Sequence, residues 1–185
     1  YIFTSFIKIF MNWEFDILYA IQSIRNPVLD RIMAVLSDIG NYGILWIAVA
    51  AVLVISKKYR LGGLQMSAAI VLTFIVGNLI LKNAFDRLRP CQIDETIHLI
   101  VKIPFDSSFP SGHTMNGITS AVSLMYVDKR MGIPACILAC AIAFSRMYNF
   151  MHFPTDVLAG AVIGAVSAVF MNWFFKKYVS AKVNN

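Results

Sequence analysis

Charged residues are scarce in this chain. Asp, Glu, Lys and Arg make up 14% of its 185 residues, whereas 58% are hydrophobic and the mean hydropathy is positive. Soluble domains carry about 25% charged residues, so this composition excludes an ordinary soluble globular protein. The sequence instead predicts an integral membrane protein.

Cysteine and histidine are also rare, with three residues of each. Two cysteines share one apolar segment and the third lies in a loop, so we expect them to pack as small hydrophobes and not to form a disulfide. A zinc site built from His98, His113 and His152 is an alternative, but no carboxylate or cysteine stands at a ligand-like spacing. We therefore expect no metal and no cofactor.

Uncharged apolar runs recur along the chain. A helix needs about 20 mostly apolar residues to cross a bilayer. Four runs, 61–81, 111–127, 131–145 and 154–175, qualify, and a fifth, 43–56, is shorter. No alternation typical of barrel strands appears, and lipid cannot satisfy free backbone groups. The sequence therefore predicts an all-α fold, a polytopic transmembrane helix bundle with five to six spans.

The first 42 residues have a different character. Segment 2–11 is apolar but contains Lys8, and segment 28–40, which follows Pro27, has amphipathic spacing. At 1.5 Å per residue, 28–40 would reach only about 20 Å, so we expect interfacial amphipathic helices here, and whether 2–11 forms an additional span is left open. The sequence has no internal repeat. It is predicted to be a single membrane-embedded domain, 1–185, with N-terminal helices in 1–42 and a transmembrane core in 43–178.

Three short polar strings interrupt the apolar pattern. They are Lys82-x6-Arg89-Pro90, Pro110-Ser111-Gly112-His113 and Ser145-Arg146-x5-His152-x3-Asp156. If each helix crosses the membrane once, the strings all fall on one face of the membrane. They bring together three permanent cations, two imidazoles and one carboxylate, which is the set of groups needed to cleave a phosphate ester without a metal.

Basic residues in the loops predict the orientation. The opposite face carries Lys57, Lys58, Arg60, Lys129, Arg130, Lys176, Lys177 and Lys182. Outside the three strings, the motif face has only Arg87 and Lys102. Because cytoplasmic loops are enriched in Lys and Arg, we expect the motif face to point to the periplasm or exterior.

The spacing of the basic and small residues suits an anion site. Lys82 and Arg89 are seven residues apart, close to two helical turns, and can lean toward one anion. Ser111 and Gly112 stand where a loop enters a helix, and free amides at a helix start bind anions. Arg146 can offer a bidentate fork. Taken singly, these residues also fit snorkelling cations and an ordinary helix cap.

The imidazoles and the carboxylate suit acid–base and nucleophilic chemistry. His113 would stand beside the anion as a proton donor. Asp156 follows His152 by four residues across a helix start, so it can fix the imidazole tautomer and leave the other nitrogen free to attack. The alternative is a capping aspartate beside an interfacial histidine. We expect Asp86 and Arg87 at the mouth of the site to be solvated loop residues or to influence headgroup choice.

The three strings together resemble the signature of the type 2 phosphatidic acid phosphatase superfamily, and the resemblance extends over about residues 28–176. It implies that His152 is a nucleophile that forms a phosphohistidine, that Asp156 orients it, and that His113 is the general acid. It also implies a metal-independent reaction in which the phosphate is held by Lys82, Arg89, Ser111, Gly112 and Arg146.

The resemblance to small bacterial members implies a lipid phosphate or diphosphate as substrate, with undecaprenyl diphosphate ranked first. Phosphatidylglycerophosphate, phosphatidate and lipid A phosphates remain alternatives. A non-enzymatic lipid transporter is the alternative from another class, although it would be expected to carry ionisable groups at mid-helix and internal repeats. The expected partners are the lipid substrate and the bilayer of the inner (plasma) membrane, without nucleic acid. The oligomeric state is left open.

Overall fold

The computed structural model describes residues 13–179, and within this range every regular element is a helix. Segment 2–11, for which an additional span was left open, lies outside the described residues. After a helix at 13–22, the chain forms α2 (Pro27–Ile39), the short turn η1 (Asn41–Gly43), α3 (Ile44–Ile55), α4 (Arg60–Phe74), the π-helical η2 (Ile75–Leu81), α5 (Lys82–Phe85), α6 (Pro90–Ile93), α7 (Gly112–Val127), α8 (Lys129–Tyr148), α9 (Pro154–Phe174) and the π-helical η3 (Phe175–Val179).

The helix starts follow local capping chemistry. Asn26 accepts hydrogen bonds from the amides of Val28 and Leu29 at the start of α2, and Pro27 occupies the first turn. Pro154 likewise opens α9. Between α2 and α3 the backbone of Gly43 has φ +68°, which glycine adopts without strain. The predicted runs therefore correspond to the helices, with boundaries set by Pro, Gly and Asn.

Three helical segments are long and apolar enough to cross a membrane, namely Arg60–Ile93, Lys129–Tyr148 and Pro154–Val179. The bent pair of α2 and α3, which meet at 43°, makes a fourth if it is counted as one span. Large apolar side chains such as Ile55, Val52 and Val166 lie exposed on the outer surface, as expected for helices that face lipid. Over residues 13–179 the protein is thus an all-helical membrane protein with three to four candidate spans.

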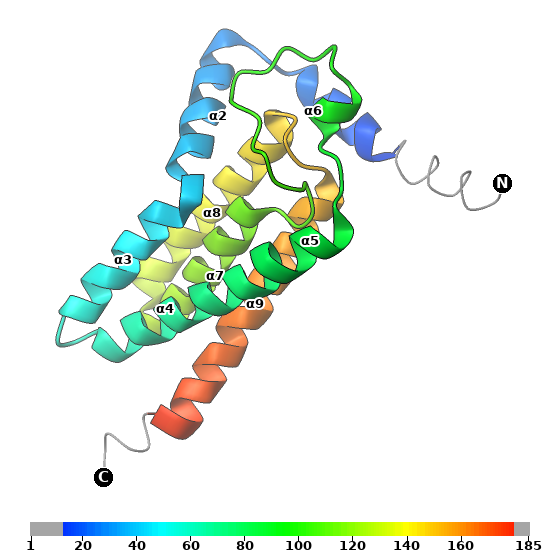
Figure 1. The fold of residues 1–185 in the computed structure, drawn as a ribbon. Helices are drawn as coiled ribbons and strands as arrows, with labels where there is room; N and C mark the ends of the chain where they lie inside the picture. Colours follow the sequence, from blue (N-terminus) through cyan, green and yellow to red (C-terminus); the bar gives the residue numbers. More distant parts are fainter. Residues whose placement is uncertain (1–12, 180–185) are drawn as a thin grey trace.

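Helix α7 occupies the middle of the bundle. It packs mainly against α8 and α9, and also against α4 (Figure 1). A Cβ on Gly164 of α9 would lie 2.6 Å from the carbonyl oxygen of Met115 in α7, and one on Gly160 would lie 2.8 Å from that of Ser111. These two glycines let α9 approach α7 closely, as small residues do between membrane helices.

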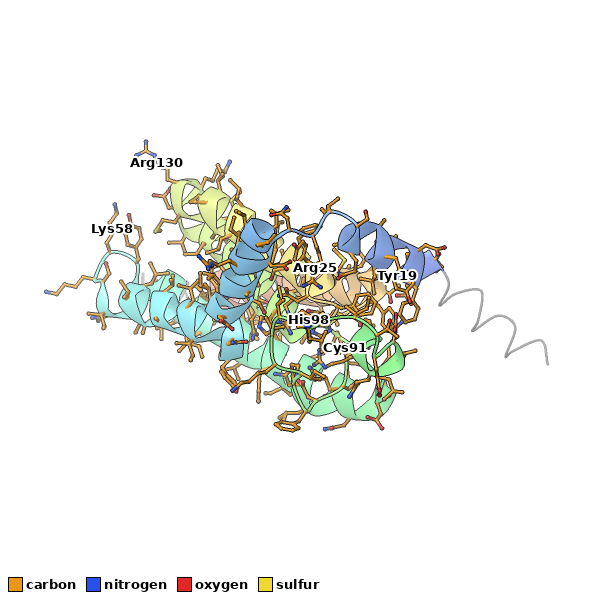
Figure 2. The ribbon with its side chains drawn as sticks, turned by 90° about the horizontal axis from the view of Figure 1, so that it is seen from above. Tyr19, Arg25, Lys58, Cys91, His98 and Arg130 are labelled. Atoms are coloured by element: carbon orange, nitrogen blue, oxygen red, sulfur yellow. The ribbon has the colours of Figure 1, made fainter. Side chains whose placement is uncertain are left out.

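The two ends of the bundle differ. Lys58 and Arg130 project at one end, whereas Arg25, Cys91 and His98 lie at the other (Figure 2). The long loop between α6 and α7 covers this second end and passes close to α2 and α8 (Figure 1). The polar strings found in the sequence converge beneath this loop.

Candidate active site

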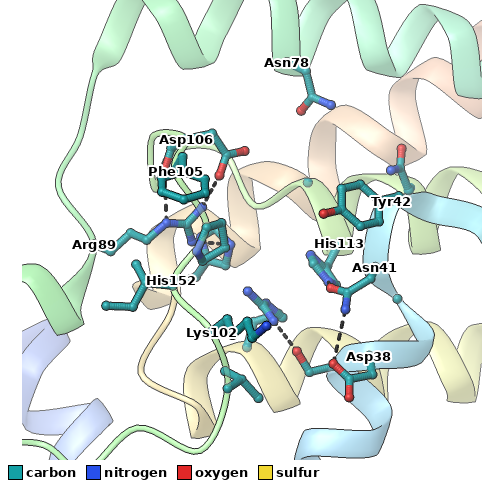
Figure 3. A pocket seen from close by; sticks show the side chains of 18 of the residues that line it. Asp38, Asn41, Tyr42, Asn78, Arg89, Lys102, Phe105, Asp106, His113 and His152 are labelled. Atoms are coloured by element: carbon teal, nitrogen blue, oxygen red, sulfur yellow. Dashed lines mark hydrogen bonds and ion pairs between the residues drawn. The ribbon is translucent and has the colours of Figure 1, made fainter.

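A cavity of about 850 Å³ lies beneath the loop that joins α6 and α7 (Figure 3). Its wall comes from several elements that are distant in sequence, including the end of α2, η1, and the starts of α5 and α7. Six of the eight predicted site residues line it: Lys82, Arg89, Gly112, His113, Arg146 and His152. Ser111 and Asp156 are fully buried behind this wall.

The three predicted cations are almost completely buried. Lys82 is 7% exposed, Arg89 1% and Arg146 2%. Because a buried charge is costly without partners, their contacts matter. Lys82 and Arg89 both form ion pairs with the carboxylate of Asp106. Arg146 donates to the hydroxyl of Ser37, and its buried Nε has no hydrogen-bond partner among the described residues. Two of the cations therefore share one carboxylate and the third has a neutral hydroxyl as its partner, so the cavity is suited to a further anion.

His152 presents one nitrogen to this cluster. It lies in the short connection between α8 and α9, and its Nδ1 is 2.7 Å from the carbonyl oxygen of Ser108. A carbonyl can only accept, so Nδ1 carries the proton and Nε2 keeps its lone pair. Nε2 lies 3.1 Å from Nη1 of Arg89. Burial, with the positive charges of Arg89 and Arg146, holds the pKa of His152 well below its usual value, so the ring is neutral at neutral pH.

Asp156 does not make the hydrogen bond to His152 that the spacing suggested. Its Oδ2 is 3.8 Å from Nδ1, beyond hydrogen-bond distance. That oxygen instead accepts from the hydroxyl of Ser108 at 2.6 Å and from the amide of Phe153 at 2.9 Å. His152 precedes the first helical residue, Pro154, so a four-residue separation does not place both side chains on one helix face. Asp156 positions His152 indirectly, by fixing Ser108.

Arg87 differs from the expected solvated loop residue. Its Nη1 donates to Asp156 Oδ1 at 2.6 Å and to the hydroxyl of Thr155 at 2.8 Å, and its Nη2 forms an ion pair with Glu14. The guanidinium carbon also lies 4.1 Å from the centre of the Phe153 ring. Arg87 therefore links the N-terminal helix to the residue that positions Ser108.

His113 is the second residue of α7 and is held by the end of α2. Its Nε2 lies 3.1 Å from Asn41 Oδ1 (Figure 3), and a Cβ on Gly40 would lie only 2.6 Å from the ring. The amide oxygen of Asn41 can only accept, so Nε2 donates to it and the ring of His113 is held at the wall of the cavity.

The start of α7 supplies neutral donors. The side chain of Ser111 makes no capping hydrogen bond and instead accepts from the hydroxyl of Thr114 at 3.0 Å. The first amides of α7 are therefore not capped by a side chain, and such amides bind anions. Gly112 borders the cavity. This arrangement can accept phosphoryl oxygens opposite the three cations.

Several residues of the site had no motif to mark them. Ser37 lies in the amphipathic segment 28–40, which was expected at the interface, and Asn41 directly follows that segment. Glu14 and Asp106 belong to stretches without regular spacing. The only local hint in the sequence was that Asp106 lies four residues before Pro110, the first residue of the second polar string. Among residues 13–179, no group of three His, Cys, Asp or Glu side chains that could hold a metal ion is formed, so the alternative three-histidine site is not assembled.

Comparison with known proteins agrees with the geometry. The chain is 34% identical over 138 residues to a protein of Sulfolobus acidocaldarius named undecaprenyl-diphosphatase, covering 74% of this chain and 66% of that one. It is 27% identical over 163 residues to undecaprenyl-diphosphatase BcrC of Bacillus subtilis, covering 84% and 80%. The aligned part thus spans slightly less than two thirds of the first relative.

A solved structure has the same fold. The crystal structure of a transmembrane PAP2-type phosphatidylglycerolphosphate phosphatase from Bacillus subtilis matches with a TM-score of 0.74 and 26% identity, covering 91% of this chain and 87% of that one. Residues 62–180 match the description of the PAP2 superfamily. This range contains all eight predicted site residues, and it is the basis for concluding that the chain belongs to the PAP2 superfamily.

Proposed function

We propose that this protein is a membrane phosphohydrolase that removes the terminal phosphate of a lipid phosphate or diphosphate through a phosphohistidine intermediate. The observation that carries the proposal is a neutral His152 at the cavity, whose Nε2 keeps its lone pair, beside three buried cations of which, within residues 13–179, only Lys82 and Arg89 have a carboxylate partner, the one they share. Such an arrangement stabilises the charge that develops on equatorial oxygens during phosphoryl transfer.

The first chemical step forms a nitrogen–phosphorus bond. His152 Nε2 attacks phosphorus while the bond to the leaving oxygen breaks, and His113 gives its proton to that oxygen. Lys82, Arg89 and Arg146, with the first amides of α7, hold the three non-bridging oxygens. In the second step a water molecule, deprotonated by His113, attacks phosphorus and the nitrogen–phosphorus bond breaks. The products are inorganic phosphate and the dephosphorylated lipid.

The lipid we rank first is undecaprenyl diphosphate. Two relatives that align with most of this chain carry the name undecaprenyl-diphosphatase. The structural relative is named a phosphatidylglycerolphosphate phosphatase, which makes that lipid the second candidate. Phosphatidate and lipid A phosphates follow. The cavity volume of about 850 Å³ exceeds what a single phosphate needs and leaves space for a larger headgroup.

The placement in the membrane completes the proposal. We infer that α3, α4, α7, α8 and α9 cross the bilayer of the plasma membrane, that the 13–22 helix and α2 lie at the interface, and that residues 1–185 form one domain. The end that carries Lys58 and Arg130 would face the cytoplasm.

The orientation can be tested by labelling. A cysteine introduced at Arg130 should react with a membrane-impermeant thiol reagent in inside-out vesicles and not in intact cells. The opposite result would reverse the orientation.

The decisive experiment measures phosphate release. The purified chain in detergent is given undecaprenyl diphosphate, phosphatidylglycerophosphate, phosphatidate and lipid A, each alone. We expect the highest kcat/KM with undecaprenyl diphosphate, and no release by the His152→Ala variant. Arg60→Ala, a change on the opposite face, serves as the control. Absence of release from every lipid would contradict the proposal and favour the transporter.

A further inference from the structure

Asp106 occupies the place where a bound phosphate is expected. It belongs to the loop between α6 and α7, and Figure 3 shows its half-exposed carboxylate beside Arg89. Oδ2 pairs with Lys82 and Oδ1 accepts from Arg89 Nη2 at 2.7 Å. A carboxylate thus already satisfies two of the three cations that would bind the substrate.

Arg89 has no donor to spare in this state. A guanidinium has five N–H groups. Nε donates to the Asp106 carbonyl, Nη1 to the Met151 carbonyl and to His152 Nε2, and Nη2 to the Asp106 carboxylate and the Ser107 carbonyl. A phosphate oxygen can bind Arg89 only if one of these acceptors leaves.

The carboxylate of Asp106 is the acceptor that can leave most easily. Its side chain is 51% exposed and can turn into the cavity without breaking the backbone. The other acceptors are backbone carbonyls and the ring of His152, which Ser108 holds from the other side. Although burial opposes ionisation of Asp106, its contacts with Lys82 and Arg89 outweigh burial and lower the pKa of the carboxyl. It therefore competes as a full negative charge.

We propose that Asp106 determines specificity by charge: it occupies the cation pair in the empty site and yields only to a phosphoryl group that carries two negative charges. A terminal phosphomonoester or diphosphate exceeds the charge of the carboxylate that it replaces. A phosphodiester carries one negative charge, the same as the carboxylate, so its attraction to the two cations is no stronger and it does not displace Asp106. The bilayer around the site is rich in phosphodiester headgroups, and Asp106 keeps them from occupying the cations.

The same exchange controls the nucleophile. While Asp106 holds Arg89, Nη1 of that residue lies 3.1 Å from the attacking nitrogen of His152 and engages its lone pair. A dianionic phosphoryl group that displaces the Asp106 carboxylate from Nη2 offers a second oxygen to Nη1, and Nη1 then donates to that oxygen in place of Nε2. The nucleophile thus becomes free when a suitable substrate is bound. This inference rests on the proposed function, because it takes a phosphoryl group as the ligand of the site.

The test compares phosphate binding and lipid inhibition in the full-length chain. Asp106→Asn removes the charge, Asp106→Glu keeps it, and Asp94→Asn removes a carboxylate of the same loop whose hydrogen bonds go to Tyr19 and Thr96. We expect Asp106→Asn to bind inorganic phosphate at least about tenfold more tightly, the effect of losing one charged hydrogen-bond competitor. Asp106→Glu and Asp94→Asn should stay close to the parent.

Inhibition by a phosphodiester lipid gives the second readout. Phosphatidylglycerol added to mixed micelles should inhibit Asp106→Asn and leave the parent and Asp94→Asn unaffected. Unchanged or weaker phosphate binding by Asp106→Asn, or equal resistance to phosphatidylglycerol, would overturn the inference. If Asp106→Asn cannot be purified folded, Asp106→Glu decides, since a glutamate variant that binds phosphate more tightly than the parent also overturns it. Failure of the parent itself to release phosphate would refute the proposed function instead.

Discussion

Arg87→Met tests the ion network that supports the active site. The substitution keeps a flexible apolar stem but removes the fork that binds Asp156 at 2.6 Å and pairs with Glu14. Both carboxylates then remain in place without their cation. Their side chains are 0% and 3% exposed, respectively, so water cannot replace the lost partner.

The magnitude follows from this burial. Removing one partner of a buried ion pair costs about 3–5 kcal/mol, because the remaining charge is left uncompensated. In a chain of this size each kcal/mol lowers the melting temperature by about 2–4 °C. We therefore expect Arg87→Met to melt about 6–20 °C below the parent. Turnover should fall even well below the melting temperature, since Asp156 no longer fixes Ser108 under His152.

The assay is thermal unfolding in detergent together with phosphate release at a temperature where all variants are folded. Arg60→Met is the matched control, because Arg60 is exposed and its guanidinium donates only to the Val54 carbonyl. In the double variant Glu14→Gln, Arg87→Met, one of the two unpaired carboxylates is neutral, so part of the lost stability should return. A melting temperature for Arg87→Met within about 2 °C of the parent would refute the reasoning. So would a double variant less stable than Arg87→Met alone.

Three further predictions concern other parts of the site. Asn41→Ala removes the hydrogen bond to His113 Nε2 at 3.1 Å, and kcat should fall by about tenfold or more with little change in KM; an unchanged kcat would exclude a positioning role. Gly164→Ala places a Cβ 2.6 Å from the Met115 carbonyl, which should destabilise the α7–α9 contact by about 1–3 kcal/mol, measured as a lower melting temperature. Incubation with EDTA should leave phosphate release unchanged, whereas loss that a divalent ion restores would contradict metal-free turnover.

The sequence predicted the helices better than their contacts. The apolar runs ended at Pro, Gly or charged residues, and these are local signals that correspond to the ends of α3, α7 and α9. Segment 28–40 was judged too short to span and was assigned to the interface. In the structure its helix, α2, packs against α8 and brings Ser37 to Arg146, a residue 109 positions away in sequence. No local pattern encodes a pairing at that separation.

The sequence predicted part of the site but not all of its contacts, again because many of these contacts join residues far apart in the chain. Residue types and motif order identified His113 and His152, which both line the cavity. The spacing of His152 and Asp156 suggested a direct hydrogen bond. Helix α9 begins only after His152, and the two side chains lie 3.8 Å apart. Each instead forms a hydrogen bond with Ser108. Arg87 seemed solvated because its partner Glu14 lies 73 positions earlier. Charges that neutralise one another across the fold look like surface charges in the sequence.

The contacts from Glu14, Ser37 and Asn41 have a consequence for dissecting the protein. All three residues precede the stretch 62–180 that matches the superfamily, yet each contacts a different residue in or beside the candidate site: Arg87, Arg146 and His113. A chimera that grafts 62–180 onto the amino-terminal part of another superfamily member would carry every signature residue and still lack their supports. Chimeras between such enzymes should therefore be active only when residues 13–43 and 62–180 come from the same parent protein.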